Sequence, residues 1–489
     1  MNTMNPSARD VTRKPDGVLS FSGALWHVAR RAPLELFSAL EELPPLVVQV
    51  LHNRGYAEVE RIHEFLNEPI LPHDPYLMRD MDKAVSRTSQ AVRSGERVCI
   101  YGDYDVDGIS ATAMLVETAI LLGIDVCSYI PDRVDEGYGL NTEAVEKIVK
   151  DGVALIITAD CGTTADEEVA RAADAGIDVI VTDHHHADAV PSRATAVLNP
   201  NSPASDYPFT GLSGVGVAYK FVQALAEEYP EKLPYPETFL DLVALGTIAD
   251  VVPLRDENRG FVIDGLEVLR QGHRAGLRAI GEVANRPIGR VTSSDIGFGI
   301  APRLNAAGRI AHAQLAFDLL REESASRAEQ IANDLDALNT ERRQLTEAAV
   351  SVARQEVGDD PVVFSVSEKF VPGVVGLAAS KLGEEFGVPA FVGALIDGVV
   401  RGSARSPQGF HLAQVLGRHA ELLETWGGHA RAAGFTVQLA NVPKLRAALV
   451  EESRVWAGDL FVGAQLHADG RVFPRTISLE TFRDLDQLA

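Results

Sequence analysis

The chain has 489 residues, of which 46% are hydrophobic and 23% are charged, and its formal net charge is −24. This composition is that of a globular protein of roughly two to four domains, and the negative charge disfavours nucleic-acid binding through diffuse basicity. No apolar run reaches the roughly 18–20 residues that a membrane span needs, and the N-terminus lacks the apolar core of a secretory signal. Cys99, Cys127 and Cys161 have no CxxC spacing, which predicts reduced thiols and a cytoplasmic protein.

The first 310 residues change in pattern along the chain. Residues 1–16 are predicted to be a disordered leader, and residues 17–75 a helical region whose apolar residues recur at helical spacing around a proline pair. In residues 76–310, short apolar runs alternate with helical patterns. The strands expected there are residues 97–102, 125–131, 154–160 and 178–183, with a short strand at residues 195–200. Such alternation predicts a parallel sheet with helices on both faces.

The second part of the chain is predicted to begin with a long connecting helix. Residues 311–358 contain no glycine or proline before Gly358. Residues 359–450 then repeat the strand–helix alternation on a smaller scale, and residues 451–489 are expected to start a β domain that the chain does not complete. The expected fold class is therefore α/β, with a parallel-sheet domain joined by a long helix to a smaller α/β domain.

Acidic residues and histidines follow the predicted strands at their carboxyl ends, where open parallel sheets bind ligands. The strands are followed by GDYDVDG, TADCGTT and DHHH, and a helix predicted at residues 239–249 ends in GTIADVV. The side chains concerned are Asp103, Asp105, Asp107, Asp160, Asp183, His184, His185, His186 and Asp250. We expect these four segments to supply one rim.

Carboxylates gathered in this way require a counter-charge, because like charges raise each other's pKa and destabilise the fold. Divalent cations supply it, and oxygen ligands with one or two imidazoles suit Mn²⁺ or Mg²⁺ better than Zn²⁺. One carboxylate shared by two ions gives the two-metal arrangement used in phosphoryl transfer.

Each motif also has a plainer interpretation when it is taken alone. The DxDxDG run resembles half a calcium loop, but position 12 of that loop is Met114 and not glutamate. A strand-end aspartate is often only a helix N-cap, and a histidine-rich loop is often only polar. The occurrence of all these motifs in order, at strand ends, favours a single site.

Arginines are concentrated in residues 259–310, which hold eight arginines and four acidic residues. The plain interpretation is a solvated face of the protein. The alternative is an anion-binding patch, because the guanidinium group suits bidentate contacts with phosphate.

At these residues the sequence resembles the DHH phosphoesterase superfamily and, within it, the RecJ-type single-strand DNA exonucleases. The resemblance covers roughly residues 50–450. The motifs that carry it are YGDYDVDG, ITADCGTT, VTDHHHADAVPSRATAVLNP, GTIADVVPL, APRLNAAGRI, GVVGLAASKL, RGSARS and GGHARAAG. It implies a parallel-sheet DHH domain and a smaller DHH-associated domain, with a central cleft between them.

The resemblance also implies an activity and a ligand set. The activity is 5′-to-3′ hydrolysis of single-stranded DNA in repair and recombination, with two Mn²⁺ or Mg²⁺ ions in each active site. Asp160 should bridge the ions and His185 should face the scissile phosphate. The ligands implied are Asp105, Asp107, Asp160, His184 and Asp250, with Asp103 as an outer ligand or a partner of the ligands. Tyr101 stands where related pyrophosphatases have a histidine, so the first metal site has a different ligand set. His186 falls outside the family motif.

Substrate-binding residues follow from the same resemblance. Phosphate or nucleotide contacts are implied for Arg303, Asn305 and Arg309, and contacts to the strand from the smaller domain are implied for Ser403, Arg405, Gly428 and His429. A glycine pair lets backbone amides approach phosphate closely. The plainer interpretations are an Arg–Asn–Arg loop that caps helices and pairs with local acids, and a glycine pair that forms a simple turn.

The implied partner is single-stranded DNA, with a single-strand-binding protein and a helicase as further partners of a cytoplasmic monomer. The family usually continues into an oligonucleotide-binding β-barrel, of which residues 451–489 would be the start. Two other functions stay open. One is a short-oligonucleotide or cyclic-dinucleotide phosphodiesterase of the same superfamily, and the other is a non-catalytic DNA-binding scaffold.

Overall fold

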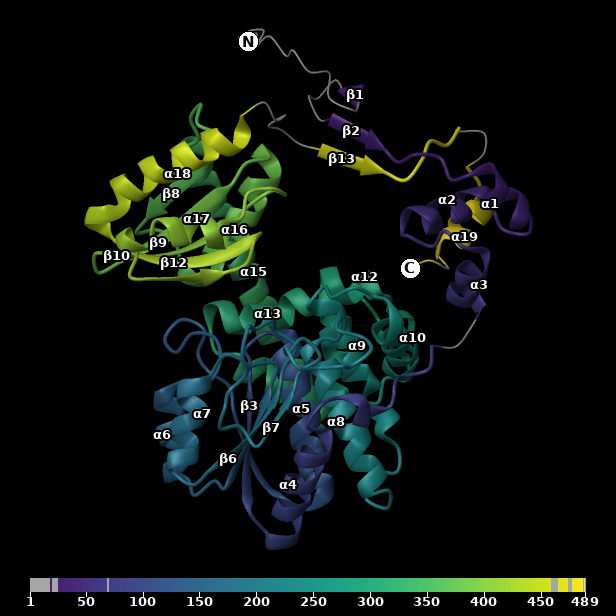
Figure 1. Ribbon diagram of the computed structural model, residues 1–489, viewed down its shortest axis with the longest axis vertical. Helices are drawn as coiled ribbons and strands as arrows, with labels where there is room; N and C mark the ends of the chain where they lie inside the picture. Colours follow the sequence, from purple (N-terminus) through teal and green to yellow (C-terminus); the bar gives the residue numbers. More distant parts are fainter. Residues whose placement is uncertain are drawn as a thin grey trace. The chain divides into compact units, whose positions relative to one another are not determined.

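The computed structural model describes residues 18–19, 25–67, 70–458, 465–473, 477–486 and 488 (Figure 1). The leader predicted at residues 1–16 lies outside the described residues. The chain forms two compact units, one of Pro69–Gln344 and one of Met1–Glu68 with Leu345–Ala489. Each unit has apolar cores of its own.

The unit Pro69–Gln344 is built around a five-stranded sheet. Its strands are β3 (Arg97–Gly102), β4 (Asp125–Tyr129), β5 (Leu155–Ala159), β6 (Asp178–Thr182) and β7 (Ala196–Leu198). Their order is β4-β3-β5-β6-β7, and every neighbouring pair is parallel. The central strand β5 is buried along its whole length, as expected for a parallel strand covered on both faces. The predicted parallel sheet is confirmed.

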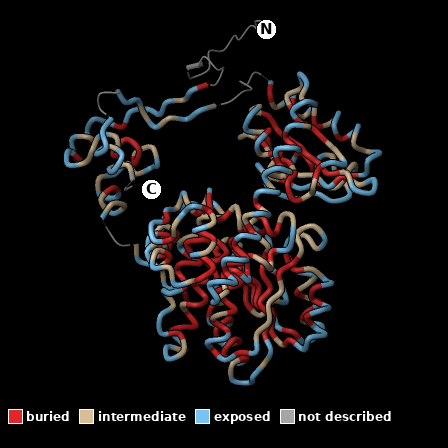
Figure 2. Tube along the Cα trace, turned by 180° about the vertical axis from the view of Figure 1, so that it is seen from behind, coloured by how far each residue is buried: buried red, intermediate tan, exposed pale blue. Residues whose placement is uncertain are grey.

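Helices cover both faces of this sheet. Side chains alternate between the faces along each strand, so Ile100 and Ile157 lie in one apolar core, and Cys99 and Ile156 in another. The first core includes α5 (Val106–Leu122), α8 (Gly214–Glu228) and α9 (Leu240–Ala249), and the second includes α6 (Thr142–Lys150) and α7 (Asp166–Asp174) (Figure 1). Figure 2 shows the buried residues gathered along the strands and between these helices.

The same unit contains several shorter elements around this framework. They are η1 (Pro75–Leu77), α4 (Met81–Ser94), η2 (Pro236–Phe239), α10 (Asp256–Gln271), α11 (Ala275–Val283), η3 (Ile288–Arg290), α12 (Ser293–Asp295), the π-helix η4 (Ile296–Ile300), α13 (Ala301–Ile310) and α14 (Gln314–Arg321). Lys220 Nζ and Glu257 Oε2 form a fully buried ion pair, 2.8 Å apart. Lys220 also donates a hydrogen bond to His73 O, and Glu257 accepts one from His73 N. These contacts tie the segment before α4 to α8 and α10.

The long connecting helix is α15 (Ala325–Gln355), which continues past Gln344 into the second unit. The sequence predicted one helix over residues 311–358, whereas the chain breaks between α14 and α15. Glu322 leaves the helical conformation, with ψ 127°, and Ser324 Oγ accepts a hydrogen bond from Arg327 N at the start of α15. A serine at this position favours a new helix start over continuation. Among the described residues, no helix is both long enough and apolar enough to cross a membrane.

The second unit contains another sheet, which is mixed. Its strands are β8 (Val363–Ser367), β9 (Ala390–Ile396), β10 (Val399–Arg405), β11 (Thr425–Gly428) and β12 (Ala432–Gln438), and its helices are α16 (Pro372–Phe386), α17 (Leu412–Arg418) and α18 (Val442–Ala457), with the short η5 (Ala420–Leu422) and η6 (Leu439–Asn441). The order is β11-β12-β10-β9-β8, and only the pair β8/β9 is parallel among these described strands. Apolar cores lie on both faces.

The last part of the chain differs from the β domain expected at residues 451–489. Residues 451–457 belong to α18, because Leu445, Leu449 and Ser453 recur at four-residue spacing on its buried face. The strand β13 (Gln465–Ala468) pairs in parallel with β2 (Leu25–Val28), which pairs with β1 (Val18–Leu19). The described tail therefore joins the N-terminal region.

The N-terminal region contains strands as well as the predicted helices. Its helices are α1 (Leu34–Ala39), α2 (Pro45–Asn53) and α3 (Val59–Asn67), and α19 (Leu479–Asp486) from the tail packs against α2. Side-chain hydrogen bonds also join the two chain segments: the Asn53 amide donates to Asp469 O at 2.8 Å, and Arg54 donates to Leu488 O at 2.6 Å.

Candidate metal centre

Three aspartates lie where β3 leads into α5. Asp105 is the N-cap of α5, since its Oδ1 accepts hydrogen bonds from Asp107 N (3.0 Å) and Gly108 N (3.1 Å). A Cβ atom added to Gly108 would lie 2.6 Å from Asp103 Cβ. Glycine at this position therefore permits the close turn that brings Asp103, Asp105 and Asp107 together.

Asp107 is held by the N-terminus of α8. Its two carboxylate oxygens accept hydrogen bonds from Gly214 N (2.7 Å) and Val215 N (2.9 Å), an arrangement that the helix dipole favours for an anion. A Cβ atom on Gly246 of α9 would lie 2.7 Å from Asp107 Oδ1. Two helices thus approach this carboxylate through glycines.

Asp160 follows β5 and has a left-handed backbone, with φ 65°. Aspartate and asparagine tolerate this conformation better than other residues with side chains. Its backbone N–H donates to Thr182 O of the neighbouring strand β6 at 2.9 Å, which fixes the turn. A Cβ atom on Gly214 would lie 2.2 Å from Asp160 Oδ1, so this carboxylate also packs against the first turn of α8.

The DHHH run is organised by Asp183. This buried carboxylate accepts hydrogen bonds from the backbone N–H groups of His184 (2.7 Å), His185 (3.1 Å) and Thr163 (2.9 Å), and it lies 2.8 Å from His185 Nδ1. Burial alone would raise its pKa, but the hydrogen bonds from His185 and Thr163 lower it to about 2. Asp183 therefore shapes the loop, and His186 is exposed.

The predicted ligands lie close together. His184 Nε2 is 3.2 Å from Asp160 Oδ1 and 3.6 Å from Asp250 Oδ2. Three groups each have potential ligand atoms within 4.8 Å of one another: Asp103, Asp105 and Asp160; Asp107, His184 and Asp250; and Asp160, His184 and His185. Asp160 and His184 each belong to two groups.

The carboxyl groups of Asp103, Asp107, Asp160 and Asp250 have raised pKa values. Burial first, and the charge of Asp250 second, raise the pKa of Asp107 to about 7. Burial and the neighbouring Asp105 raise the pKa of Asp250 to about 6. The pKa values of Asp103 and Asp160 are raised well above the usual range by the same two causes, burial and adjacent carboxylates. Negative charge is therefore unfavourable here without a cation.

Unpaired polar atoms show that the cluster fits a cation. Asp103 Oδ1, Asp160 Oδ1 and His184 Nε2 are buried and make no hydrogen bond of good geometry to the described residues, although the last two atoms lie 3.2 Å apart. Buried polar atoms are otherwise nearly always paired, and an ion is one of the few partners that could satisfy all three. Oxygen atoms dominate the set, and no described cysteine belongs to it, which suits Mn²⁺ or Mg²⁺.

Tyr138 borders the cluster beside His185. Its hydroxyl oxygen lies 2.8 Å from His185 Nδ1 and donates to Asp160 O at 3.1 Å. Glycines with positive φ flank it on both sides, Gly137 (81°) and Gly139 (86°), so the loop turns sharply and directs the ring to the site. Burial alone would lower the pKa of His185, but Asp183 raises it to about 9.

Sequence reasoning missed the residues that hold the DHHH loop from outside. Asn199 Nδ2 donates to His185 O (2.9 Å) and to Thr163 Oγ1 (2.8 Å), and Asn201 Nδ2 donates to His184 O (2.7 Å). Both asparagines follow β7 in the motif VLNPN. Their position after the next parallel strand was the available signal, because that strand ends at the same edge of the sheet.

The structure places two of the predicted phosphate-binding residues in specific contacts. Arg303 Nε donates to Asp336 Oδ1 at 2.8 Å, and its Nη1 donates to Gly299 O at 2.7 Å. Asn305 Oδ1 accepts a hydrogen bond from Val106 N at 3.2 Å, in the first turn of α5. Burial raises the pKa of the Tyr104 phenol, and Arg309 lies near enough to offset a small part of that rise. The Arg303–Asp336 pair and the Asn305 contact with the first turn of α5 are the local pairing and helix capping that the plainer interpretation of this segment predicts.

Asn305→Ala is expected to lower the free energy of unfolding by about 1 kcal/mol, because it removes the acceptor for Val106 N. Urea denaturation measures the change. Asn333→Ala is the matched control, since Asn333 is exposed and donates only to Glu329 O in its own helix. An equal loss in both variants, or no loss in Asn305→Ala, would contradict the capping role.

The predicted strand-binding residues of the smaller domain lie on two parts of its sheet. Ser403 and Arg405 are on β10, and a Cβ atom on Gly376 of α16 would lie 3.1 Å from Ser403 Oγ and 3.4 Å from Arg405 Nη2. Gly428 ends β11 with φ 135°, and exposed His429 begins the turn to β12. A Cβ atom on Gly428 would lie 2.4 Å from Ala432 O, so the turn itself requires glycine.

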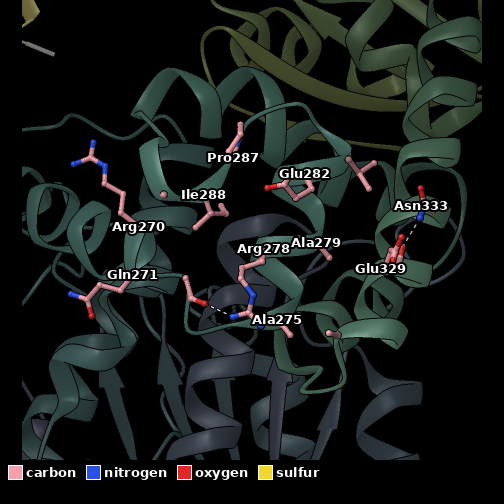
Figure 3. A pocket seen from close by; sticks show the side chains of 14 residues that line it. Arg270, Gln271, Ala275, Arg278, Ala279, Glu282, Pro287, Ile288, Glu329 and Asn333 are labelled. Atoms are coloured by element: carbon pink, nitrogen blue, oxygen red, sulfur yellow. Dashed lines mark hydrogen bonds between the residues drawn. The ribbon is translucent and has the colours of Figure 1, made fainter.

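A cavity of about 650 Å³ lies elsewhere in the unit Pro69–Gln344, between α10, α11, η3 and the start of α15 (Figure 3). None of the residues in the three groups of potential metal ligands lines this cavity. Its Arg278 donates to Gly272 O and its Asn333 to Glu329 O, so these polar groups serve the local fold. We place the site at the carboxylate cluster, where three buried polar atoms that make no hydrogen bond lie on candidate ligands.

Comparison with known families agrees with this geometry. The model of the DHH family, N-terminal domain, matches residues 97–247, and the DHHA1 domain model matches residues 359–453. RecJ of Bacillus subtilis, described as a single-stranded-DNA-specific exonuclease, is 40% identical over 435 residues, which cover 87% of this chain and 55% of the relative. RecJ of Salmonella typhimurium is 34% identical over 476 residues, covering 92% of this chain and 82% of the relative.

Solved structures show the same fold. RecJ from Thermus thermophilus in complex with Mn²⁺ matches with a TM-score of 0.82 and 30% identity, over 95% of this chain and 67% of that one. The Mg²⁺ complex from the same organism has a TM-score of 0.76 and 28% identity, over 95% of this chain and 65% of that one. The chain spans little more than half the length of the B. subtilis relative.

The two family-model matches identify this two-unit α/β protein, with its carboxylate and histidine cluster at the edge of a parallel sheet, as a DHH-type protein. The chain belongs to the RecJ family of these proteins.

Proposed function

We propose that the protein is a metal-dependent exonuclease that hydrolyses phosphodiester bonds of single-stranded DNA from the 5′ end, in DNA repair and recombination. The observation that carries this proposal is the set of three groups of potential metal ligands, which overlap because Asp160 and His184 each belong to two of them. Two sites that share a carboxylate suit phosphoryl transfer. The curated relatives described as single-stranded-DNA-specific exonucleases support the substrate class.

Two Mn²⁺ or Mg²⁺ ions are the cofactors proposed, with Asp105, Asp107, Asp160, His184 and Asp250 as ligands and Asp103 as an outer ligand. When bound, the ions would offset the negative charge that develops on the phosphate. The solved RecJ structures in complex with Mn²⁺ and with Mg²⁺ support both metals. The three unpaired buried atoms support two ions at one rim.

The protein's own groups would orient the phosphodiester. His185 Nδ1 is held by Asp183 Oδ1 at 2.8 Å, which leaves Nε2 to contact the scissile phosphate. Tyr138 also limits the movement of this ring, because its hydroxyl oxygen contacts the same Nδ1 atom at 2.8 Å. Arg303, Asn305 and Arg309 would hold the adjoining nucleotide, and Ser403, Arg405, Gly428 and His429 would hold the strand from the smaller domain.

Partners and location are also proposed. A single-strand-binding protein and a helicase would supply the strand to a monomer in the cytoplasm. Because the chain carries a net charge of −24, binding would depend on a local group of arginines, and affinity for DNA would fall steeply with salt.

The test is digestion of single strands labelled at the 5′ or the 3′ end, with Mn²⁺, Mg²⁺ or a chelator. We expect early release of the 5′ label in the presence of either metal and none with the chelator. Early release of the 3′ label would refute the direction. Activity that survives chelation would refute the metal requirement.

Assays of the same purified protein distinguish the proposed exonuclease from two other candidate functions. A short-oligonucleotide or cyclic-dinucleotide phosphodiesterase would turn over dinucleotides faster than long strands. A non-catalytic scaffold would bind DNA without Mn²⁺-dependent hydrolysis, but all the expected ligands are present and close together, which disfavours that function.

A further inference from the structure

Phe298 is among the most exposed apolar side chains described in the structure, with 89% of its surface accessible. It occupies the middle of η4, whose first and last residues, Ile296 and Ile300, are fully buried. The two isoleucines anchor the turn, and Phe298, two positions from each, projects outward between Gly297 and Gly299. A π-helical turn is rare and frequently occurs at a functional site.

The neighbours of η4 attach it to the end of α9 that leads to the candidate ligand Asp250. A Cβ atom on Gly297 would lie 3.7 Å from Ile248 Cγ2, near the end of α9. The helix α9 ends just before the candidate ligand Asp250. On the other side, Arg303 donates to Gly299 O at 2.7 Å. The exposed ring is thus attached to a turn between a candidate metal ligand and a candidate phosphate-binding residue.

Val251 adds a second exposed apolar group at the same end of α9. It directly follows Asp250, is 85% accessible, and donates from its backbone to Ile248 O at 3.3 Å. Its φ is 62°, a left-handed conformation that is unfavourable for a β-branched residue. The surrounding structure holds the residue in this conformation although its side chain makes little contact with the protein.

We propose that Phe298 and Val251 form an apolar ledge on which an unpaired nucleobase of the bound strand stacks. This inference rests on the proposed function, and it names the part of the site that contacts the base. Metal ions and arginines bind phosphate, which single and double strands share. An aromatic face instead binds any unpaired base through stacking, irrespective of sequence. The ledge therefore contributes to the preference for single strands.

The test compares two short phosphorothioate-linked strands, oligodeoxythymidine and an abasic strand of equal length, in binding to the whole protein with Mn²⁺. Fluorescence anisotropy gives the dissociation constants without hydrolysis. Variants are Phe298→Ala, which removes the ring, and Phe298→Trp, which keeps an aromatic face. Tyr235→Ala is the matched control, because Tyr235 is also an exposed aromatic residue, with 72% of its surface accessible. It follows the C-terminal end of the 15-residue helix α8, whereas Asp107 and Asp160 contact the first turn at the opposite end of that helix.

We expect the wild type and Tyr235→Ala to bind the base-bearing strand at least about fivefold more tightly than the abasic strand. Phe298→Ala should bind both strands equally, and Phe298→Trp should keep the preference. Equal binding of the two strands by the wild type, or a preference that survives in Phe298→Ala, would overturn the ledge. Cleavage of ordinary single strands is assayed separately, so absent Mn²⁺-dependent cleavage would count against the proposed function and leave the binding result to decide on the ledge.

Discussion

Asp160→Asn is expected to reduce Mn²⁺-dependent hydrolysis of single-stranded DNA by roughly a thousandfold or more, because Asp160 belongs to two of the three groups of potential metal ligands. Asparagine is the informative replacement. It has the same shape and tolerates the left-handed backbone at φ 65°, whereas alanine would add backbone strain. Release of nucleotides from a labelled strand measures the effect.

The same variant separates loss of a ligand from loss of the fold. Without metal, its melting temperature should equal or exceed that of the wild type, because one of several adjacent carboxylates is removed. Added Mn²⁺ should raise the melting temperature of the wild type more than that of the variant. Asp188→Asn, which changes an exposed acid in the loop after β6, is the control and should behave like the wild type. Activity of Asp160→Asn within tenfold of the wild type would contradict the shared-ligand arrangement.

Gly214→Ala is expected to have the second largest effect, although it changes no candidate ligand. The added Cβ atom would lie 2.2 Å from Asp160 Oδ1 and 2.5 Å from Asp160 Cγ, so the carboxylate or the first turn of α8 must move. A shift of about 1 Å at a catalytic group can lower the rate by roughly a hundredfold. We expect a loss of at least that size in hydrolysis with Mn²⁺, measured at saturating strand.

Gly216→Ala is the control for this substitution, because it lies in the same turn of α8. Its nearest neighbour would be Ser213 Oγ, the N-cap of α8, at 3.1 Å, a much looser contact than the 2.2 Å at Gly214. Alanine should otherwise suit a helix better than glycine. Near wild-type activity is therefore expected for Gly216→Ala, and equal losses in the two variants would show that the effect arises from α8 in general and not from the approach to Asp160.

The ligand cluster could be predicted from sequence because of a simple property of parallel sheets. Strands that run in the same direction end at one edge, so residues as distant in sequence as Asp105 and His184 converge when each follows a buried strand. The alternation of apolar runs with helical patterns gave the strand positions. The DHH resemblance and the parallel α/β fold are both confirmed.

Other features could not be predicted, because they depend on packing. Gly214 and Gly246 have no sequence signal for their approach to Asp160 and Asp107, which arises only when α8 and α9 pack against α5. The break near Ser324 is a local capping event within a long helical pattern. The pairing of β13 with β2 involves residues from opposite ends of the chain, and periodicity carries no information on such partners.

The pairing of Leu25 with Gln465 also constrains the order of folding. These residues are about 440 positions apart, and closing a loop of that length costs roughly 5 kcal/mol of chain entropy before any other contact contributes. During synthesis, β2 must wait for its parallel partner until residue 465 has left the ribosome, whereas the sheet β3–β7 has all its strands by residue 198. The sheet β3–β7, which carries the candidate ligands, can therefore form early and independently, and the two ends of the chain join last.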